Sequence, residues 1–132
     1  MVRLLLDSCS FLWLIGQRAA LPEKVRDAIA EPDNACFLSA ASLWEILIKH
    51  RAGRIEIDSR GVPSERFLIE QREAHGIDPL PVDEAAVSQL PKLPELHRDP
   101  FDRMLVCQAI AHGLTLVTPD EAIRKYPVRT LW

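Results

Sequence analysis

The amino-acid sequence predicts an α/β fold, a three-layer α/β/α sandwich around a central, mostly parallel sheet. Short apolar runs typical of buried strands alternate along the chain with longer amphipathic segments typical of helices. A helix between successive strands is the crossover that a parallel sheet requires, and such helices cover both of its faces. No internal repeat, low-complexity segment or linker interrupts the 132 residues, so we expect a single domain over residues 1–132.

The predicted strands are short apolar runs bounded by polar or turn-forming residues. In chain order they are Val2–Leu6, Ala35–Leu38, Ile77–Val82, Leu114–Thr118 and Val128–Leu131. Pro79 and Pro81 cannot donate to a strand ladder, so the third strand is expected at an edge of the sheet. The segment Arg54–Asp58 alternates apolar and polar residues, which predicts a minor strand or an extended loop.

The predicted helices are bounded by capping residues at their starts and by glycines at several of their ends. In chain order they are Ser8–Gly16, Pro22–Ala30, a segment from Ser39 or Ser42 to Gly53, Pro63–His75, Asp83–Leu90, Pro100–His112 and a short helix from about Asp120. Ser8 is the expected cap of the first helix, with Asp7 as the alternative. Pro22 is expected at the first position of the second helix.

The composition limits the classes of protein to consider. Lys and Arg number 16 against 19 Asp and Glu, so any nucleic-acid-binding role needs local basic patches. The cysteines Cys9, Cys36 and Cys107 are odd in number and widely spaced, which favours buried free thiols in a reducing compartment. Asp7 interrupts the N-terminal apolar run, and no stretch of about 18 apolar residues exists. We therefore expect a cytoplasmic protein without a membrane segment.

Five acidic residues fall where predicted strands end or predicted helices begin. Asp7 directly follows the first strand, and Asp120 follows the fourth strand by two residues. Glu45 lies in the first turns of the helix after the second strand, while Asp99 and Asp102 open the helix that leads into the fourth. Ligands of open α/β sheets bind outside the carboxyl ends of the strands, where all five acids are expected.

Each of these acids also has a purely structural interpretation. Four of them suit helix starts, as N-caps or as partners of the helix dipole: Asp7, Asp99, Asp102 and Asp120. Glu45 stands four residues before Lys49, the order that favours an ion pair on a helix surface. Their coincidence at one end of the sheet weakens this interpretation. Two carboxylates about 4 Å apart repel by about 4 kcal/mol at an effective dielectric constant near 20, so a converging group needs a cation.

The kind of cation follows from the ligand atoms. Carboxylate oxygens without a His or Cys cluster favour Mg²⁺ or Mn²⁺ over zinc. Such a site suits the activation of water and the stabilisation of a phosphodiester transition state.

Four segments of the chain carry a resemblance to a known family: LLLDSCSFLW, SAASLWEILIKHRAGRI, HRDPFDRMLVCQAIAHGLTLVTPD and the closing YPVRTLW. In these segments the chain resembles a PIN-domain ribonuclease, specifically the VapC-type toxin of bacterial toxin–antitoxin pairs. Together they span nearly the whole chain in the family's order. The resemblance implies a PIN-like fold and Mg²⁺- or Mn²⁺-dependent cleavage of single-stranded or looped RNA by water.

The resemblance also implies roles for particular residues. The family's acidic quartet falls on Asp7, Glu45, Asp102 and Asp120. Asp7 and Asp102 would hold the metal most directly, while Glu45 and Asp120 would complete its shell or position water. Asp99 is then a capping residue or an auxiliary acid. Supporting hydroxyls are expected from three residues, the first of which stands where the family commonly has Thr: Ser8, Ser39 and Thr118.

Basic residues flank this acidic centre and are candidates for holding RNA phosphates. They are Lys49, Arg51, Arg54, Arg98 and Arg103, with His97 beside them. Those at the end of a helix equally suit its dipole, and Arg98 and Arg103 could pair with neighbouring acids. The expected partners are RNA, a cognate antitoxin in the active-site groove and a second copy of the chain. Trp13 and Trp44 are expected in the core or in a dimer contact.

Two other functions remain open from the sequence. A haloacid-dehalogenase-like phosphatase also places an Asp after its first strand, but it needs a second Asp two positions later, where this chain has Cys9. A non-catalytic RNA- or protein-binding module of the same fold would use its acids as helix caps only.

Overall fold

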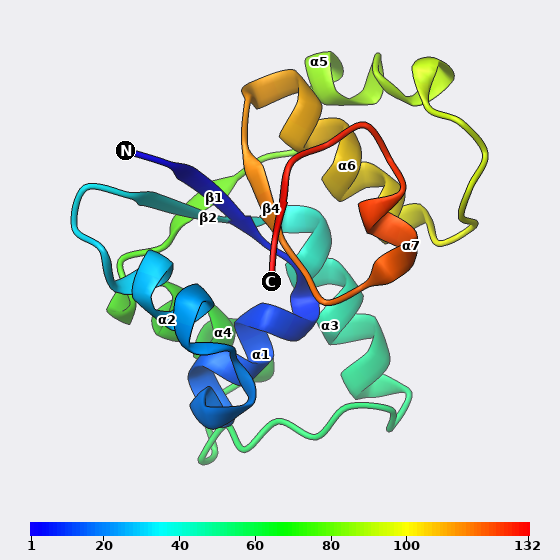
Figure 1. Cartoon of the computed structure of the whole chain (residues 1–132). Coiled ribbons are helices and arrows are strands. Elements are labelled where there is room, and N and C mark those ends of the chain that lie inside the picture. Colours follow the sequence, from blue (N-terminus) through cyan, green and yellow to red (C-terminus); the bar gives the residue numbers. More distant parts are fainter.

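The central sheet has five strands, and every neighbouring pair runs parallel. In the computed structural model, which describes residues 1–132, the strands are β1 (Arg3–Leu6), β2 (Ala35–Ser39), β3 (Asp78–Leu80), β4 (Thr115–Val117) and β5 (Thr130–Leu131). Their order is β3-β2-β1-β4-β5, with β1 in the middle (Figure 1). The predicted parallel α/β sandwich is confirmed, and so is the edge position of the proline-containing strand β3.

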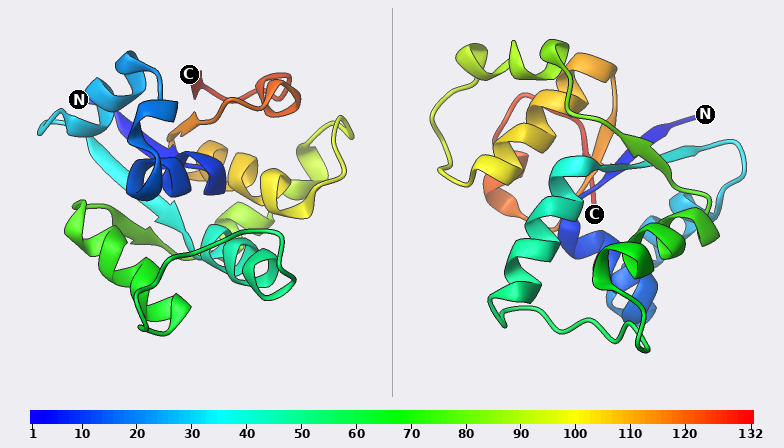
Figure 2. Two further views of the ribbon diagram at one scale, coloured as in Figure 1. Left: turned by 90° about the horizontal axis from the view of Figure 1, so that it is seen from below. Right: turned by 180° about the vertical axis from the view of Figure 1, so that it is seen from behind.

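Helices lie on both sides of this sheet (Figure 2). They are α1 (Ser8–Gly16), α2 (Glu23–Ala30), α3 (Ala40–Arg51), α4 (Ser64–Ala74), α5 (Glu84–Val87), α6 (Pro100–His112) and α7 (Glu121–Arg124). Short 3₁₀ turns cover Arg18–Ala20 and Leu90–Lys92. All seven predicted helices are present, whereas Arg54–Asp58 is a loop and contains no strand. None of the helices is both long and apolar enough to cross a membrane.

The helix starts refine the predicted caps. Asp7, and not Ser8, is the N-cap of α1, because its Oδ1 accepts a hydrogen bond of 2.8 Å from the Ser10 N–H. Ser8 already lies inside the helix. Pro22 occupies the N-cap position of α2 and not its first helical position. Ser39, the first of the two predicted candidates, caps α3 with its side-chain oxygen.

Alternate side chains of β1 enter two separate apolar cores, one on each face of the sheet. Leu4 and Leu6 pack with residues of α1, α2, α3 and α4, while Leu5 packs with residues of α5, α6 and α7. None of these three leucines is more than 1% exposed. A strand buried on both faces must be apolar at every buried position, which explains the three consecutive leucines after the exposed Arg3.

The structure narrows the prediction for Trp44 and corrects the one for Cys9. Trp44 is 64% exposed on α3, which excludes a place in the core and leaves the dimer contact as a prediction; its ring makes a T-shaped contact with that of Phe101 at a centroid distance of 5.7 Å. Cys9 is half-buried, although the other two free cysteines are buried as expected. Trp13 is half-buried against the first core, and its ring lies 5.6 Å from that of Trp132.

Helix α6 ends at Gly113, which has a φ of 66° in the left-handed region. A Cβ at this position would meet no atom within 4 Å, so the cost of a side chain is backbone strain alone. We expect Gly113→Ala to lower the free energy of unfolding by about 1 kcal/mol, measured by urea denaturation. Gly16→Ala is the control, because its Cβ also meets nothing and its φ is not positive. An equal loss in both variants would contradict this explanation.

Candidate active site

Three strand ends meet at the site, and the register of the sheet brings them level. Leu6 of β1 pairs with Leu38 of β2 and with Val117 of β4. The residue that follows each of these lies at the carboxyl end of its strand: Asp7, Ser39 and Thr118. The two hydroxyl residues are fully buried and Asp7 is only 6% exposed. The sheet therefore presents one buried carboxylate between two buried hydroxyls.

Asp7 is held at this position by the start of α1. Its Oδ1 caps the helix at Ser10, and the Ser10 hydroxyl in turn donates to the carbonyl of Val117 at 3.1 Å. Burial raises the pKa of the Asp7 carboxyl above its ordinary value, and the negative charge of Glu45 raises this pKa further. A raised pKa means that the ionised carboxylate lacks sufficient positive charge around it.

Glu45 enters the site from α3 with both carboxylate oxygens engaged. The Ser8 hydroxyl donates to Oε1, and Lys49 lies 2.9 Å from Oε2. The Glu45 side chain is 5% exposed, so this pair belongs to the site and is not the surface ion pair that the sequence allowed. The hydrogen bond that Lys49 donates to Glu45 raises the pKa of Lys49 above its ordinary value. The charges of Asp99 and Asp102 raise it as well, which places the ammonium group among the acids.

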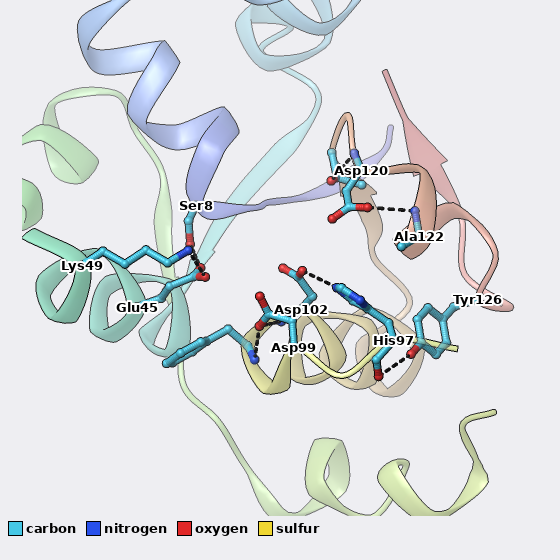
Figure 3. Close-up of polar contacts among 11 residues, drawn as sticks. Ser8, Glu45, Lys49, His97, Asp99, Asp102, Asp120, Ala122 and Tyr126 are labelled. Carbon is cyan, nitrogen blue, oxygen red and sulfur yellow. Dashed lines mark hydrogen bonds and ion pairs between the residues drawn. The ribbon is translucent and has the colours of Figure 1, made fainter. Parts of the chain in front are cut away.

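Asp102 lies between acids that come from different elements. In Figure 3, Glu45 of α3 and Asp120 at the start of α7 point toward Asp102 from opposite sides. His97 Nε2 is 2.8 Å from Asp102 Oδ2. Burial raises the pKa of Asp102 to about 6, and the surrounding acids add to this against the opposing hydrogen bond from His97. The hydrogen bond to Asp102 likewise raises the pKa of His97.

The tightest group of possible metal ligands consists of His97, Asp102 and Asp120. One ligand atom from each lies within 4.8 Å of the other two. From the sequence, we expected His97 only among the residues that hold phosphate and not as a member of this group. Its spacing of five residues before Asp102 was visible, but the turn that brings the ring back to the carboxylate was not.

Asp99 and Asp120 are helix caps, as the sequence predicts. Oδ1 of Asp99 accepts hydrogen bonds from the N–H groups of Phe101 and Asp102, at 2.9 and 3.2 Å. Oδ1 of Asp120 accepts from the Ala122 N–H at 2.8 Å. Because each cap uses Oδ1, the second oxygen of each carboxylate remains for another partner. Capping and ligand binding are therefore compatible in the same residue.

The predicted basic residues differ in their distance from the acids. Lys49 contacts Glu45 directly. Arg98 and Arg103 line a surface pocket together with His97, and neither forms an ion pair with an acid. Arg51 and Arg54 are exposed at and beyond the end of α3. The alternative in which Arg98 and Arg103 neutralise neighbouring acids is therefore not observed.

The chemistry of this group fits a divalent cation. Its acids are Asp7, Glu45, Asp99, Asp102 and Asp120, whereas only Lys49 and His97 contact them with positive or ionisable nitrogen. Two of the acids, Asp7 and Asp102, have a pKa raised by burial and by neighbouring negative charge. Carboxylate oxygens are the ligands that Mg²⁺ and Mn²⁺ prefer.

The raised pKa of Asp102 predicts how the stability of the metal-free protein depends on pH. Between the ordinary pKa of 3.8 and the folded-state value of about 6, the folded protein holds a proton that the unfolded chain releases. Stability therefore falls as the pH rises through this range. We expect Asp102→Asn to raise the free energy of unfolding at pH 8 by about 1–2 kcal/mol, a value reduced for solvent screening. Urea denaturation in chelator should show a smaller gain at pH 4.

Asp83→Asn is the matched control for this variant. Asp83 also has a histidine partner, His112, whose Nε2 lies 2.8 Å from its Oδ2. However, the hydrogen bond from the Ala86 N–H lowers the pKa of Asp83, so removing its charge should give no gain at pH 8. A gain of the same size in both variants would show that repulsion within the site is not its cause.

The PIN domain family matches the sequence over residues 4–128. No curated protein sequence matches the chain. Among solved structures, VapBC2 from Rickettsia felis bound to a DNA fragment from their promoter is similar, with a TM-score of 0.70, 13% identity and coverage of 98% of both chains.

Two further structures show the same likeness. VapBC-1 from nontypeable Haemophilus influenzae has a TM-score of 0.63 and 17% identity, covering 98% of this chain and 97% of that chain. DNA-bound VapBC from Salmonella typhimurium has a TM-score of 0.64 and 19% identity, covering 99% of this chain and 98% of that chain. At these identities the likeness shows a shared fold. Because the family match extends over nearly the whole chain, the protein belongs to the PIN domain family.

Proposed function

We propose that this PIN-domain protein is a Mg²⁺- or Mn²⁺-dependent endoribonuclease and the toxin of a toxin–antitoxin pair. It cleaves single-stranded or looped RNA by the attack of water on a phosphodiester bond. The observation that carries the proposal is the convergence of buried and half-buried carboxylates near the carboxyl ends of β1, β2 and β4. The match to the PIN domain family supports it.

The acidic residues divide the work of the site. Asp7 and Asp102 hold the cation most directly, and Glu45 and Asp120 complete its shell or position the attacking water. When bound, the cation lowers the pKa of water and offsets the charge that develops on the phosphodiester. Asp99 is an auxiliary acid at the rim of the site, in addition to its capping role.

The supporting hydroxyls act on this group in different ways. Ser8 donates to Glu45 and fixes the direction of its carboxylate. Ser39 caps α3, the helix that carries Glu45. Thr118 accepts a hydrogen bond of 3.1 Å from the backbone N–H of Asp120. All three therefore position acids and need no contact with the substrate.

RNA phosphates bind to the basic residues around the acidic centre. The proposed contacts are Lys49, Arg51, Arg54, Arg98 and Arg103. The four arginines are free of ion pairs with acids, which leaves their guanidinium groups available to phosphate. Neither alternative function gains support: Cys9 stands where a haloacid-dehalogenase-like phosphatase needs its second Asp, and a binding-only module has no use for carboxylates that repel one another.

Cleavage of RNA tests the proposal. Purified protein is incubated with a mixed RNA pool that contains structured transfer RNAs, with Mn²⁺, with Mg²⁺ and with chelator. We expect cleavage that requires the metal and falls at least 100-fold in Asp102→Asn, because the variant loses a charged ligand oxygen. Asp83→Asn keeps full activity, since Asp83 pairs with the last residue of α6, ten residues and about 15 Å along the helix from Asp102.

The outcomes of this assay separate the possibilities. Equal cleavage by the wild type and Asp102→Asn would point to a contaminating nuclease or a wrong site. Metal binding without cleavage of any RNA in the pool would favour the binding-only module. Loss of activity in both variants would show that the effect is not specific to the site.

A cytoplasmic toxin of this kind needs partners. We propose that a cognate antitoxin covers the active-site groove and that the chain forms a homodimer. The similar solved structures are of VapBC proteins, which supports the first proposal. Exposed apolar side chains support the second, above all Trp44 and Ile48 on α3, which are 64% and 44% exposed.

The homodimer gives a direct prediction for Trp44. Replacing it by Lys places a charge in the proposed contact, and we expect the dimer to dissociate at least 30-fold more readily, about 2 kcal/mol. Sedimentation velocity over a range of concentrations measures this change. Ile69→Lys on α4 is the control, because Ile69 is also exposed but lies on another helix. A wild-type monomer at all concentrations, or the same shift in both variants, would refute this contact.

A further inference from the structure

We propose that His97 is a nitrogen ligand of the metal site and that it makes the site favour Mn²⁺ over Mg²⁺. The inference rests on the proposed function, since it concerns the same cation. It goes further by assigning a ligand outside the acidic quartet. It also chooses between two metals that the acids alone leave open.

The imidazole of His97 lies within reach of the same cation as Asp102 and Asp120. Nε2 of His97 lies 2.8 Å from Asp102 Oδ2, and the two residues together with Asp120 offer ligand atoms within 4.8 Å of one another. Donors that share one cation at about 2.1 Å can lie up to about 4.2 Å apart. The three atoms are therefore close enough for small side-chain rotations to bring them onto one cation. Figure 3 shows the His97 ring directed at Asp102.

His97 is held in place before any metal binds. Its side chain is 25% exposed, so most of the ring is covered. Its backbone carbonyl accepts a hydrogen bond of 3.4 Å from the hydroxyl of Tyr126, a residue that is 3% exposed in the second core. Two residues later Asp99 caps α6, which fixes the other side of this turn. The imidazole is thus presented by anchored backbone.

Mg²⁺ and Mn²⁺ differ in their preference for oxygen and nitrogen donors. Mg²⁺ prefers an all-oxygen shell, whereas Mn²⁺ is a softer transition-metal ion that accepts nitrogen donors more readily than Mg²⁺ does. An imidazole that replaces a water on Mg²⁺ gains little, and on Mn²⁺ it gains more. A shell that adds the nitrogen of His97 to the oxygens of the acids therefore shifts selectivity toward Mn²⁺.

A comparison within the molecule separates this role from simple pairing. His112 and Asp83 form a second His–Asp contact of the same 2.8 Å length. That pair has no third ligand in reach, because the only such group in the structure is the one around Asp102. The contact between His97 and Asp102 is therefore not evidence by itself. The added carboxylate of Asp120 distinguishes it.

The experiment uses Mn²⁺ alone, without RNA, on the purified full chain at pH 8. Pulsed electron paramagnetic resonance detects ¹⁴N bound directly to Mn²⁺. We expect this nitrogen signal in the wild type and in His112→Gln, and its loss in His97→Gln. Calorimetric titration should show Mn²⁺ affinity about tenfold weaker in His97→Gln, with Mg²⁺ affinity changed less than twofold. Circular dichroism and urea denaturation confirm that each variant is folded.

Three results would overturn the inference. Mn²⁺ bound to the wild type without a nitrogen signal would show an all-oxygen shell and leave the proposed nuclease intact. An equal loss of affinity for Mn²⁺ and Mg²⁺ in His97→Gln, with no nitrogen signal in the wild type, would make His97 a positioning residue for Asp102. No binding of either metal to the wild type would remove both this inference and the metal dependence proposed above. The wild-type spectrum decides the question even if a variant does not fold.

Discussion

Mutual repulsion among carboxylates at the carboxyl ends of three strands is the constraint on which the site depends. Asp7 is almost completely buried, and burial together with the charge of Glu45 raises its pKa. Asp102 is half-buried, and its burial raises its pKa to about 6. Such an arrangement is unfavourable for folding on its own. It persists because other parts of the fold hold each acid in place. The nitrogens of Lys49 and His97 offset part of the negative charge.

Helix N-termini hold several of these acids in place. Three of the acids cap helices through Oδ1: Asp7 on α1, Asp99 on α6 and Asp120 on α7. Each cap satisfies backbone N–H groups that would otherwise lack a partner and places the negative charge at the positive end of a helix dipole. The structural and the chemical interpretations of these residues are therefore two uses of one carboxylate. One oxygen serves the helix, and the other is left for the site.

Periodicity made most of the fold predictable, and residue type made most of the site predictable. The buried strand β1 and the capped helix α6 have clear local signals, so their bounds differ from the prediction by one residue at most. What the sequence left open depends on the path of the chain in three dimensions. His97 reaches Asp102 only through the path of a turn, and the exposure of Trp44 depends on how α3 packs against the rest of the chain. Neither fact has a signature in local sequence.

Small hydroxyl side chains explain how the acids stay together in spite of their repulsion. Ser39 and Thr118 are fully buried, and each accepts a hydrogen bond from a backbone N–H two residues ahead, at 3.0 and 3.1 Å. Ser10 ties the start of α1 to the end of β4 through the Val117 carbonyl. These bonds fix the direction of the chain where it leaves each central strand. A longer side chain at these positions would fill the space that the carboxylates need. The backbone, more than any pairing of charges, sets the spacing of the acids and with it the size of cation that they can share.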